Sequence, residues 1–294
     1  MARLLDFVAQ RPGSARFWMT FHLTLWLYRY LRLIIHCVSH WRYKSGIPKK
    51  EPKYWSEDVT VVIPTIHNDF TALKDSLHSI LACNPAKLIL VTTAGRYHAL
   101  EQMTATLRPT DGTTIETVSM GKANKRLQMC RALEGDHIQT AITVLADDDV
   151  EWPPTLMPWL LAPFEDDNIG GVGTCQKVKR VDGDLIMRIF NWLGAAYIER
   201  RNFEISATYN IDGGTSCMSG RTGAYQSEIL KSYDFLDGFE NEKWGKYILN
   251  ADDDNFVTRW LVAHQWKTWV QYNPECEIET TLETSVGFLY QCSR

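Results

Sequence analysis

Three consecutive carboxylates, Asp147–Asp149, directly follow an apolar run of the sequence, Ala141–Ala146, that has the pattern of a buried strand. A D-x-D pattern at a strand end places Asp147 and Asp149 on the same side of the extended backbone, because side chains alternate along a strand. Two such carboxylates suit Mg²⁺ or Mn²⁺, which prefer oxygen ligands and take further ones from a nucleotide diphosphate. The structural alternative is an acidic turn that caps a helix begun at Pro153. The pattern favours metal or nucleotide binding.

A second acidic cluster, Asp252–Asp254, precedes the helical apolar pattern of "NFVTRWL". At least one of its members is a candidate N-cap for that helix. Two separate acidic centres also suit a reaction in which one holds a metal and the other takes a proton from an attacking hydroxyl. Between the clusters lies the glycine-rich segment "IDGGTSCMSGRTGAY". Its glycines would let the backbone approach a ligand closely, but ordinary turn chemistry explains them equally well.

The elements that must position these clusters alternate between strand and helix patterns along the chain. Expected strands cover 58–65, 86–93, 113–120 and 140–146, and expected helices cover 70–83, 97–107 and 122–135. This alternation predicts an α/β fold with a parallel, doubly wound sheet and helices on both faces. Ligands bind such sheets beyond the carboxyl ends of the strands, where helix N-termini favour anions. The first acidic cluster stands at such an end.

The segment 17–38 is rich in large apolar residues and lacks Gly and Pro. At about 1.5 Å per residue it is long enough to cross a bilayer core of roughly 30 Å. Arg29 and Arg32 share one helical stripe with two histidines, so we expect either a transmembrane helix or an amphipathic helix in the membrane interface. Residues 1–16 are then an N-terminal tail and 39–57 a basic linker, which by the positive-inside rule places domain 58–294 in the cytosol.

Composition bounds the possible partners. The 294 residues carry a formal net charge of -4, which leaves no basic surface for nucleic acid. The seven cysteines are odd in number and include no C-x-x-C pair, which argues against a zinc site or a disulfide framework. We therefore expect a reducing environment around the main domain.

Several segments, in order, resemble motifs of the processive family 2 glycosyltransferases, which include hyaluronan, chitin and cellulose synthases. They are "VTVVIPT", "GKANKRLQ", "LADDDVEWP", "SCMSGRTGAY", "ADDDNFVTRW" and the terminal "QCSR". The resemblance is greatest to fungal capsular-polysaccharide-synthase-like and hyaluronan-synthase-like proteins, and it spans about Val59 to Arg294. It implies a GT-A fold with a doubly wound mixed sheet that binds a UDP-sugar, with Asp147 and Asp149 on a Mn²⁺ or Mg²⁺ ion.

The resemblance also implies roles for further residues. Lys122 matches the family's basic residue near the nucleotide, although a surface lysine in a turn is an equally good interpretation. The "SCMSG" segment matches the acceptor loop of hyaluronan synthases, which assigns Cys217, Ser219 and Gly220 to the acceptor. Gln291 and Arg294 begin the Q-x-x-R-W motif on the acceptor side, with Arg294 near pyrophosphate. The spacing to Thr258 selects Asp254 as the catalytic base, with Asp253 as the alternative.

The sequence departs from the family pattern at two places. The usual Asp after the second strand is absent, so we expect Thr65 or Asp69 to contact the nucleotide instead. The chain ends inside Q-x-x-R-W, which implies a truncated or a naturally short form. The expected activity is that of a membrane-associated inverting glycosyltransferase that adds a sugar from a UDP-sugar to a β-linked polysaccharide. The alternative is an inactive or regulatory nucleotide-binding partner of a full-length synthase.

Overall fold

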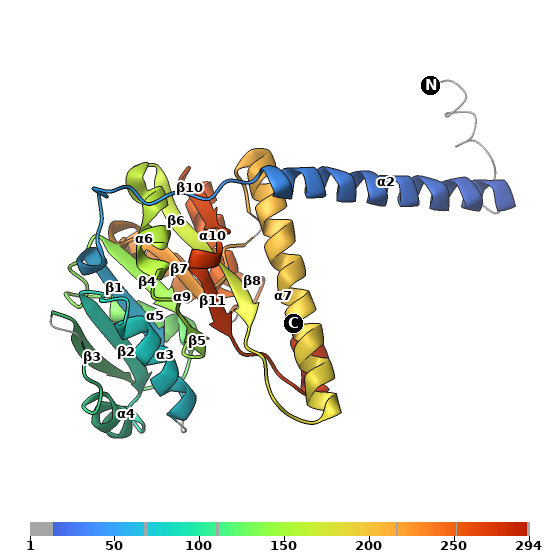
Figure 1. The fold of residues 1–294 in the computed structure, drawn as a ribbon. Helices are drawn as coiled ribbons and strands as arrows, with labels where there is room; N and C mark the ends of the chain where they lie inside the picture. The colour runs from blue at the N-terminus through green and yellow to red at the C-terminus, as the bar shows by residue number, and fades with distance from the viewer. Residues whose placement is uncertain (1–13, 68–69, 110–111, 216, 251, 293–294) are drawn as a thin grey trace.

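Parallel strands with helices on both faces form the half of the structure that precedes the first acidic cluster (Figure 1). The structure is a computed structural model that describes residues 14–67, 70–109, 112–215, 217–250 and 252–292. The expected strands and helices of this half are all present, each beginning and ending within three residues of its expected bounds. The regular apolar periodicity of this half is what made its elements predictable.

The strands are β1 (Val59–Pro64), β2 (Lys87–Thr93), β3 (Thr114–Met120), β4 (Ile142–Ala146), β5 (Val150–Glu151), β6 (Ile169–Val178), β7 (Thr222–Gln226), β8 (Lys243–Trp244), β9 (Tyr247–Ile248), β10 (Lys267–Gln271) and β11 (Glu277–Thr280). The α-helices are α2 (Ala15–Arg42), α3 (Thr71–Leu81), α4 (Tyr97–Thr104), α5 (Lys125–Leu133), α6 (Leu156–Leu161), α7 (Leu185–Asp212), α8 (Ser227–Leu230), α9 (Tyr233–Asn241), α10 (Asp253–Ala263) and α11 (Gly287–Gln291).

The main sheet is mixed. Among the described residues it has nine strands, in the order β3-β2-β1-β4-β7-β6-β11-β5, with β10 paired to β6. Strands β3, β2, β1 and β4 are parallel, as the alternation of strands and helices predicts. Strand β7 runs antiparallel to both β4 and β6. Strand β6 pairs in parallel with β10 and β11, so the parallel sheet expected from the residues alone is interrupted by the antiparallel β7. The mixed sheet implied by the resemblance is present.

Two apolar cores cover the two faces of the sheet. On one face Ile63 of β1 belongs to a core with Leu77 of α3 and further side chains of α4 and α6. On the other face Val62, the preceding residue of β1, belongs to a core with Met129 of α5 and side chains of α9 and α10. Strand β1 is buried along its whole length because both faces are covered, which explains its unbroken β-branched run. This packing fixes the carboxyl end of β4.

Helix α2 extends away from the rest of the structure (Figure 1). Its last turns pack on α7, where the Ser39 hydroxyl donates to the Ala207 carbonyl at 2.7 Å and His40 Nδ1 lies 2.8 Å from Ser206 Oγ. Within the described residues, no helix combines the length and the apolar character that crossing a bilayer requires. The expected span over 17–38 is therefore not supported. Charged and histidine side chains, such as Arg29, interrupt its apolar surface.

The segment after α2 is tied to the sheet by one buried glutamine, Gln271 of β10. Its Oε1 accepts from the Gly46 backbone N–H at 2.8 Å and from the Trp269 indole N–H at 3.2 Å. Its Nε2 donates to the carbonyls of Gly46 and Trp159. Gln271 is 0% exposed, so water cannot replace its side chain as the partner of these backbone and indole groups. The linker expected over 39–57 thus begins within the last turn of α2, which ends at Arg42, and then continues as a segment that is hydrogen-bonded to the domain at Gly46.

We expect Gln271→Leu to lower the free energy of unfolding by about 2 kcal/mol, because it leaves buried donors and acceptors unpaired. Chemical denaturation measures this change. Lys50→Ala, an exposed change in the same segment, is the matched control and should shift stability by less than about 0.5 kcal/mol. Equal effects of the two substitutions would contradict the inference that Gln271 ties the segment after α2 to the sheet.

Candidate active site

The two acidic clusters meet at one lysine, Lys125, in the first turn of α5. Its Nζ lies 2.7 Å from Asp147 Oδ1 and 3.0 Å from Asp253 Oδ2. Asn124 caps the helix, with its side chain accepting from the Leu127 backbone N–H at 3.1 Å, and this cap fixes where the first turn begins. The end of β4 and the start of α10, distant in sequence, are thus held at one ammonium group.

The electrostatics of this cluster show an excess of negative charge. Burial lowers the pKa of Lys125, but the carboxylates of Asp147 and Asp253 outweigh burial and raise it above the ordinary lysine value. Burial raises the pKa of Asp147; Lys125 opposes this effect, while the nearby Asp149 and Asp253 carboxylates add to it. One lysine therefore does not fully offset the acids, and the site favours a further cation.

The remaining two carboxylates of the first cluster have partners of their own. Strand β4 ends at Ala146, so the cluster lies in a turn before β5 and the expected strand alternation does not apply to it. Asp148 Oδ2 lies 3.4 Å from His67 Nε2. Asp149 Oδ2 accepts from the Thr281 hydroxyl at 2.9 Å. Since β4 stops before the cluster, the turn sends its three side chains to three different partners.

A cavity of about 520 Å³ opens beside Asp149. Its other lining residues belong to the segment from β11 to α11: Thr281, Leu282, Glu283, Thr284, Gly287 and Tyr290. This segment was not among the expected site residues, because its sequence carries no recognisable motif before "QCSR". Gln291 follows Tyr290 at the end of α11, but its side chain lies outside the description, as do Arg294 and Asp69.

The second acidic cluster begins α10 instead of capping it through a side chain. Asp252 occupies the N-cap position with φ of 58° and makes no side-chain capping bond, so the expected capping role fails at this residue. Asp254 Oδ2 accepts from the Gly220 backbone N–H at 3.3 Å, and Oδ1 accepts from the Asn255 N–H at 2.8 Å. Among the described residues, no basic side chain lies within ion-pair distance of Asp254, in contrast to Asp253.

The glycine-rich loop lies directly against this second cluster. A Cβ added to Gly220 would lie 3.2 Å from Asp254 Cβ and 3.4 Å from Asp253 Oδ2, so a glycine allows this close approach. Cys217 is buried next to Asp254: burial, aided by the Asp254 carboxylate, raises the pKa of its thiol to about 12, so it stays protonated at neutral pH. Ser219 is also buried, and its hydroxyl accepts from the Arg221 N–H at 3.3 Å.

Two other expected nucleotide-binding residues lie apart from the acidic clusters. Lys122 is exposed in the turn after β3, with no hydrogen-bond or ion-pair partner in the described part of the chain, and Lys125 takes the place between the acids. Thr65 is buried just beyond β1, where its carbonyl accepts from Gln128 Nε2 at 3.2 Å and its hydroxyl accepts from the His67 N–H at 3.5 Å. His67, the partner of Asp148, follows Thr65 by two residues.

Arg126 is a second residue that the sequence interpretation missed. It is buried beside Lys125 and donates from Nη1 to Glu242 Oε2 at 2.8 Å and from Nη2 to the Asp252 carbonyl at 3.1 Å. It therefore holds the backbone that leads into the second acidic cluster. A basic pair at the start of a helix was the available signal, but the partners lie more than a hundred residues away.

The donor set near Asp147 fits a divalent cation whose shell is completed by a substrate. In the described ranges, no group of three or more His, Cys, Asp or Glu side chains is placed to hold a metal alone. Asp147 and Asp149 offer carboxylate oxygens, and the Asp149 carboxylate is close enough to help raise the pKa of Asp147. A hard cation bound by two carboxylates usually takes its remaining ligands from phosphates and water.

Comparison of the sequence with known proteins gives consistent matches. Residues 57–294 match the glycosyltransferase-like family 2. The chain is 65% identical over 282 residues to a type 2 glycosyltransferase of Gibberella zeae, covering 96% of this chain and 53% of that protein. It is 27% identical over 274 residues to the NDP-glycosyltransferase ltbB of Aspergillus luteorubrus, covering 92% of this chain and 66% of that protein. The chain thus spans about half to two thirds of these relatives.

The fold is similar to that of a solved mannosyltransferase, PcManGT from Pyrobaculum calidifontis, determined in complex with GDP-Man and Mn²⁺. The TM-score is 0.58 at 19% sequence identity, with 88% of this chain and 68% of that chain covered. At this identity the likeness concerns the fold alone, and it supports the GT-A assignment of the mixed sheet.

We expect Lys125→Met to lower the free energy of unfolding at neutral pH by about 1–2 kcal/mol, because Asp147 and Asp253 would lose their shared cation. A lysine whose pKa is raised by folding contributes its full stabilisation below about pH 10, so neutral pH reports it fully. Lys122→Met is the matched control. Urea denaturation should separate the two variants, and the loss in Lys125→Met should shrink as acid protonates the facing carboxylates. A similar loss of unfolding free energy in both variants would contradict a stabilising contact of Lys125 with Asp147 and Asp253.

Proposed function

The chain belongs to glycosyltransferase family 2, and from this premise we propose that it transfers a sugar from a UDP-sugar to a growing β-linked polysaccharide with inversion at the anomeric carbon. One observation carries the proposal: Lys125 joins Asp147 to Asp253, and the next residue, Asp254, lies against the Gly220 loop. A donor-binding cluster and a proton acceptor are thus adjacent but distinct.

In this proposal the first acidic cluster binds the donor. Asp147 and Asp149 would hold Mn²⁺ or Mg²⁺ together with diphosphate oxygens, and the chemistry supplied there is Lewis-acid stabilisation of the departing UDP. The cavity beside Asp149 gives the donor room. Lys125 keeps the cluster together before the donor arrives. The nucleotide sugar and Mn²⁺ in the structure of PcManGT are consistent with this assignment.

Asp254 is the proposed base because it differs from Asp253 in its partners. Asp253 is paired with Lys125, whereas the Asp254 oxygens accept from the backbone N–H groups of Gly220 and Asn255 and, in the described part of the chain, have no basic side chain within ion-pair distance. Those donors orient the carboxylate and leave it able to accept another proton. The acceptor hydroxyl would attack the anomeric carbon as the bond to UDP breaks, and its proton would pass to Asp254. No covalent glycosyl-enzyme forms in this single displacement.

The acceptor would approach along Cys217, Ser219 and Gly220. The pKa of the Cys217 thiol, raised to about 12 by burial, keeps it neutral, so it contributes shape and not a nucleophile. Gly220 brings a backbone N–H directly to Asp254. The acceptor loop and the base therefore form one unit.

We also propose that α2 lies on the cytosolic surface of a membrane without crossing it. Its exposed side chains include Trp18, Phe21, Leu23, Trp26, Leu27 and Leu31. An apolar surface this large on one helix marks a contact site, and aromatic and basic side chains suit a lipid interface. The basic residues that follow α2 would face anionic headgroups.

The chain with Mn²⁺ and labelled UDP-glucose, UDP-glucuronate or UDP-N-acetylglucosamine tests the transfer. We expect Asp254→Asn to lower transfer about 10²–10⁴-fold with UDP affinity unchanged, since it removes only the proton acceptor.

Asp149→Asn should weaken Mn²⁺-dependent UDP binding about tenfold or more. Asp148→Asn, which alters the neighbour that contacts His67, is the matched control and should stay near wild type.

Two outcomes would contradict parts of this proposal. Full activity in Asp254→Asn would remove Asp254 as the base. Tight UDP binding with no turnover of any donor would instead support a nucleotide-binding partner role.

Sedimentation with vesicles that contain anionic lipid tests the placement of α2. We expect the double variant Leu23→Glu/Leu27→Glu to lower the vesicle-bound fraction several-fold, because both side chains are exposed and apolar on α2. Val262→Glu changes an exposed apolar residue of α10 and is the control. Wild-type chain that stays wholly in the supernatant would contradict the lipid contact.

A further inference from the structure

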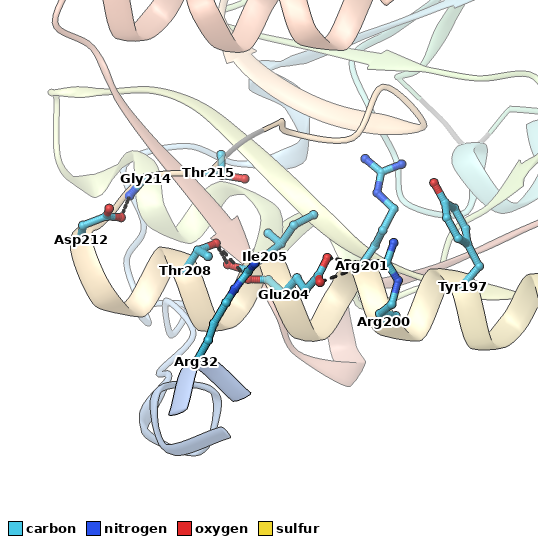
Figure 2. A pocket seen from close by; sticks show the side chains of 10 residues that line it. All are labelled: Arg32, Tyr197, Arg200, Arg201, Glu204, Ile205, Thr208, Asp212, Gly214 and Thr215. Atoms are coloured by element: carbon cyan, nitrogen blue, oxygen red, sulfur yellow. Dashed lines mark hydrogen bonds and ion pairs between the residues drawn. The ribbon is translucent and has the colours of Figure 1, made fainter. Parts of the chain in front are cut away.

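A second cavity, of about 520 Å³, lies between α2, α7 and the start of the glycine-rich loop (Figure 2). Helix α7 supplies most of its lining, α2 supplies Arg32, and Gly214 and Thr215 come from the segment after α7. Figure 2 shows Arg32 reaching from α2 toward α7. None of these residues belongs to the first acidic cluster, and the sequence analysis gave no role to the arginines of α7.

The cavity carries more positive than negative charge that is free to act on a ligand. Its two acids are engaged locally: Glu204 accepts from Arg200 at 3.0 and 3.1 Å, and Asp212 accepts from the Gly214 N–H at 2.8 Å. Arg32 and Arg201 have no hydrogen-bond or ion-pair partner among residues 14–67, 70–109, 112–215, 217–250 and 252–292. A partly buried guanidinium such as Arg201 loses part of its hydration, and an oxyanion would both accept its hydrogen bonds and compensate its charge.

The cavity is continuous with the residues around the proposed base. The hydroxyl of Thr215 in its lining donates to the Cys217 carbonyl at 3.2 Å. Burial and the Asp254 carboxylate raise the pKa of the Cys217 thiol to about 12, and the nearby Arg201 charge acts in the opposite direction. Cys217 is therefore within electrostatic reach of both Arg201 and Asp254. A ligand in the cavity lies on the acceptor side of Asp254.

The donor side lies across α7. The aromatic ring of Tyr197, in the cavity lining, contacts Phe288 of α11 with ring centroids 6.4 Å apart. The same helix meets the segment that lines the Asp149 cavity at Gly194, where an added Cβ would lie 3.0 Å from Leu282 Cδ1. Helix α7 thus contacts both the basic cavity and the segment that lines the Asp149 cavity.

We propose that the cavity between α2 and α7 binds an oxyanion of the acceptor substrate, a phosphate or a carboxylate, through Arg201 and Arg32. Guanidinium groups match the planar, two-oxygen geometry of either anion. The inference rests on the proposed transferase function, since it assigns the acceptor class to that same site. It also accounts for two arginines that have no acid partner in the described part of the chain and that lie beside the segment next to the proposed base.

Isothermal titration calorimetry of the full chain tests the proposal with three probes: inorganic phosphate, glucuronate and farnesyl phosphate, all without metal. We expect at least one probe to bind, and Arg201→Gln to weaken its binding about tenfold or more, as expected for a lost charged contact of about 1.4 kcal/mol. Arg188→Gln makes the same change on the same helix, outside the cavity, and should bind like wild type. Tighter binding of glucuronate assigns a sugar acid, and tighter binding of farnesyl phosphate assigns a lipid phosphate.

Arg32→Gln changes an exposed residue of α2 and should also weaken binding of the same probe. It replaces Arg201→Gln in the test if that variant fails to fold. Binding of UDP with Mn²⁺ should be unchanged in both variants. If the wild-type chain does not bind UDP but still binds a probe in a way that depends on Arg201, the donor proposal is contradicted. The proposal that the cavity binds an oxyanion is then still supported. Absence of binding by all three probes, or equal binding by wild type and both arginine variants, would overturn the cavity assignment.

Discussion

The contact of Lys125 with Asp147 and Asp253 is the interaction on which the candidate site depends. Two carboxylates about 4 Å apart repel by roughly 4 kcal/mol at the effective dielectric of a protein surface, so their approach needs a cation between them. Lys125 provides it from the first turn of α5. The neighbouring Arg126 secures the same region differently, by binding the carbonyl of Asp252. One helix start therefore places both the donor cluster and the backbone that leads to the proposed base.

Local patterns predicted the first half of the fold and the two acidic clusters. Strand β1 is an unbroken β-branched run, helix α3 repeats its apolar residues at helical spacing, and "ADDDV" is visible without any tertiary contact. The choice between Lys122 and Lys125 was beyond such patterns, because it depends on where the Asn124 cap begins the helix. The bend of the chain after Ala146 likewise depends on β5 pairing with β11, a contact between distant segments.

Helix α7 shows a different limit of sequence interpretation. Its charged and polar residues interrupt any single apolar stripe, so its 28 residues give no strong helical period. It packs on β6 and β10 as well as on α2 and α11, through contacts such as Asn202 to Gln176 and Ser39 to Ala207. The expected membrane span failed for a related reason: the arginines that made α2 amphipathic also lower its apolar character below that of a spanning helix.

The charges on the two sides of α7 impose a constraint on any acceptor. A donor diphosphate can approach Asp147 and Asp149 only with a cation, since both partners are anionic. An acceptor that also carries an oxyanion would be repelled by the same carboxylates unless a basic group compensates. Arg201 lies near Cys217 and lines the basic cavity, and in the proposed function it would supply that compensation. If both proposals hold, the basic cavity and the acidic cluster would act as a pair, with the Cys217 segment in contact with Thr215 of the cavity lining and close to Asp254.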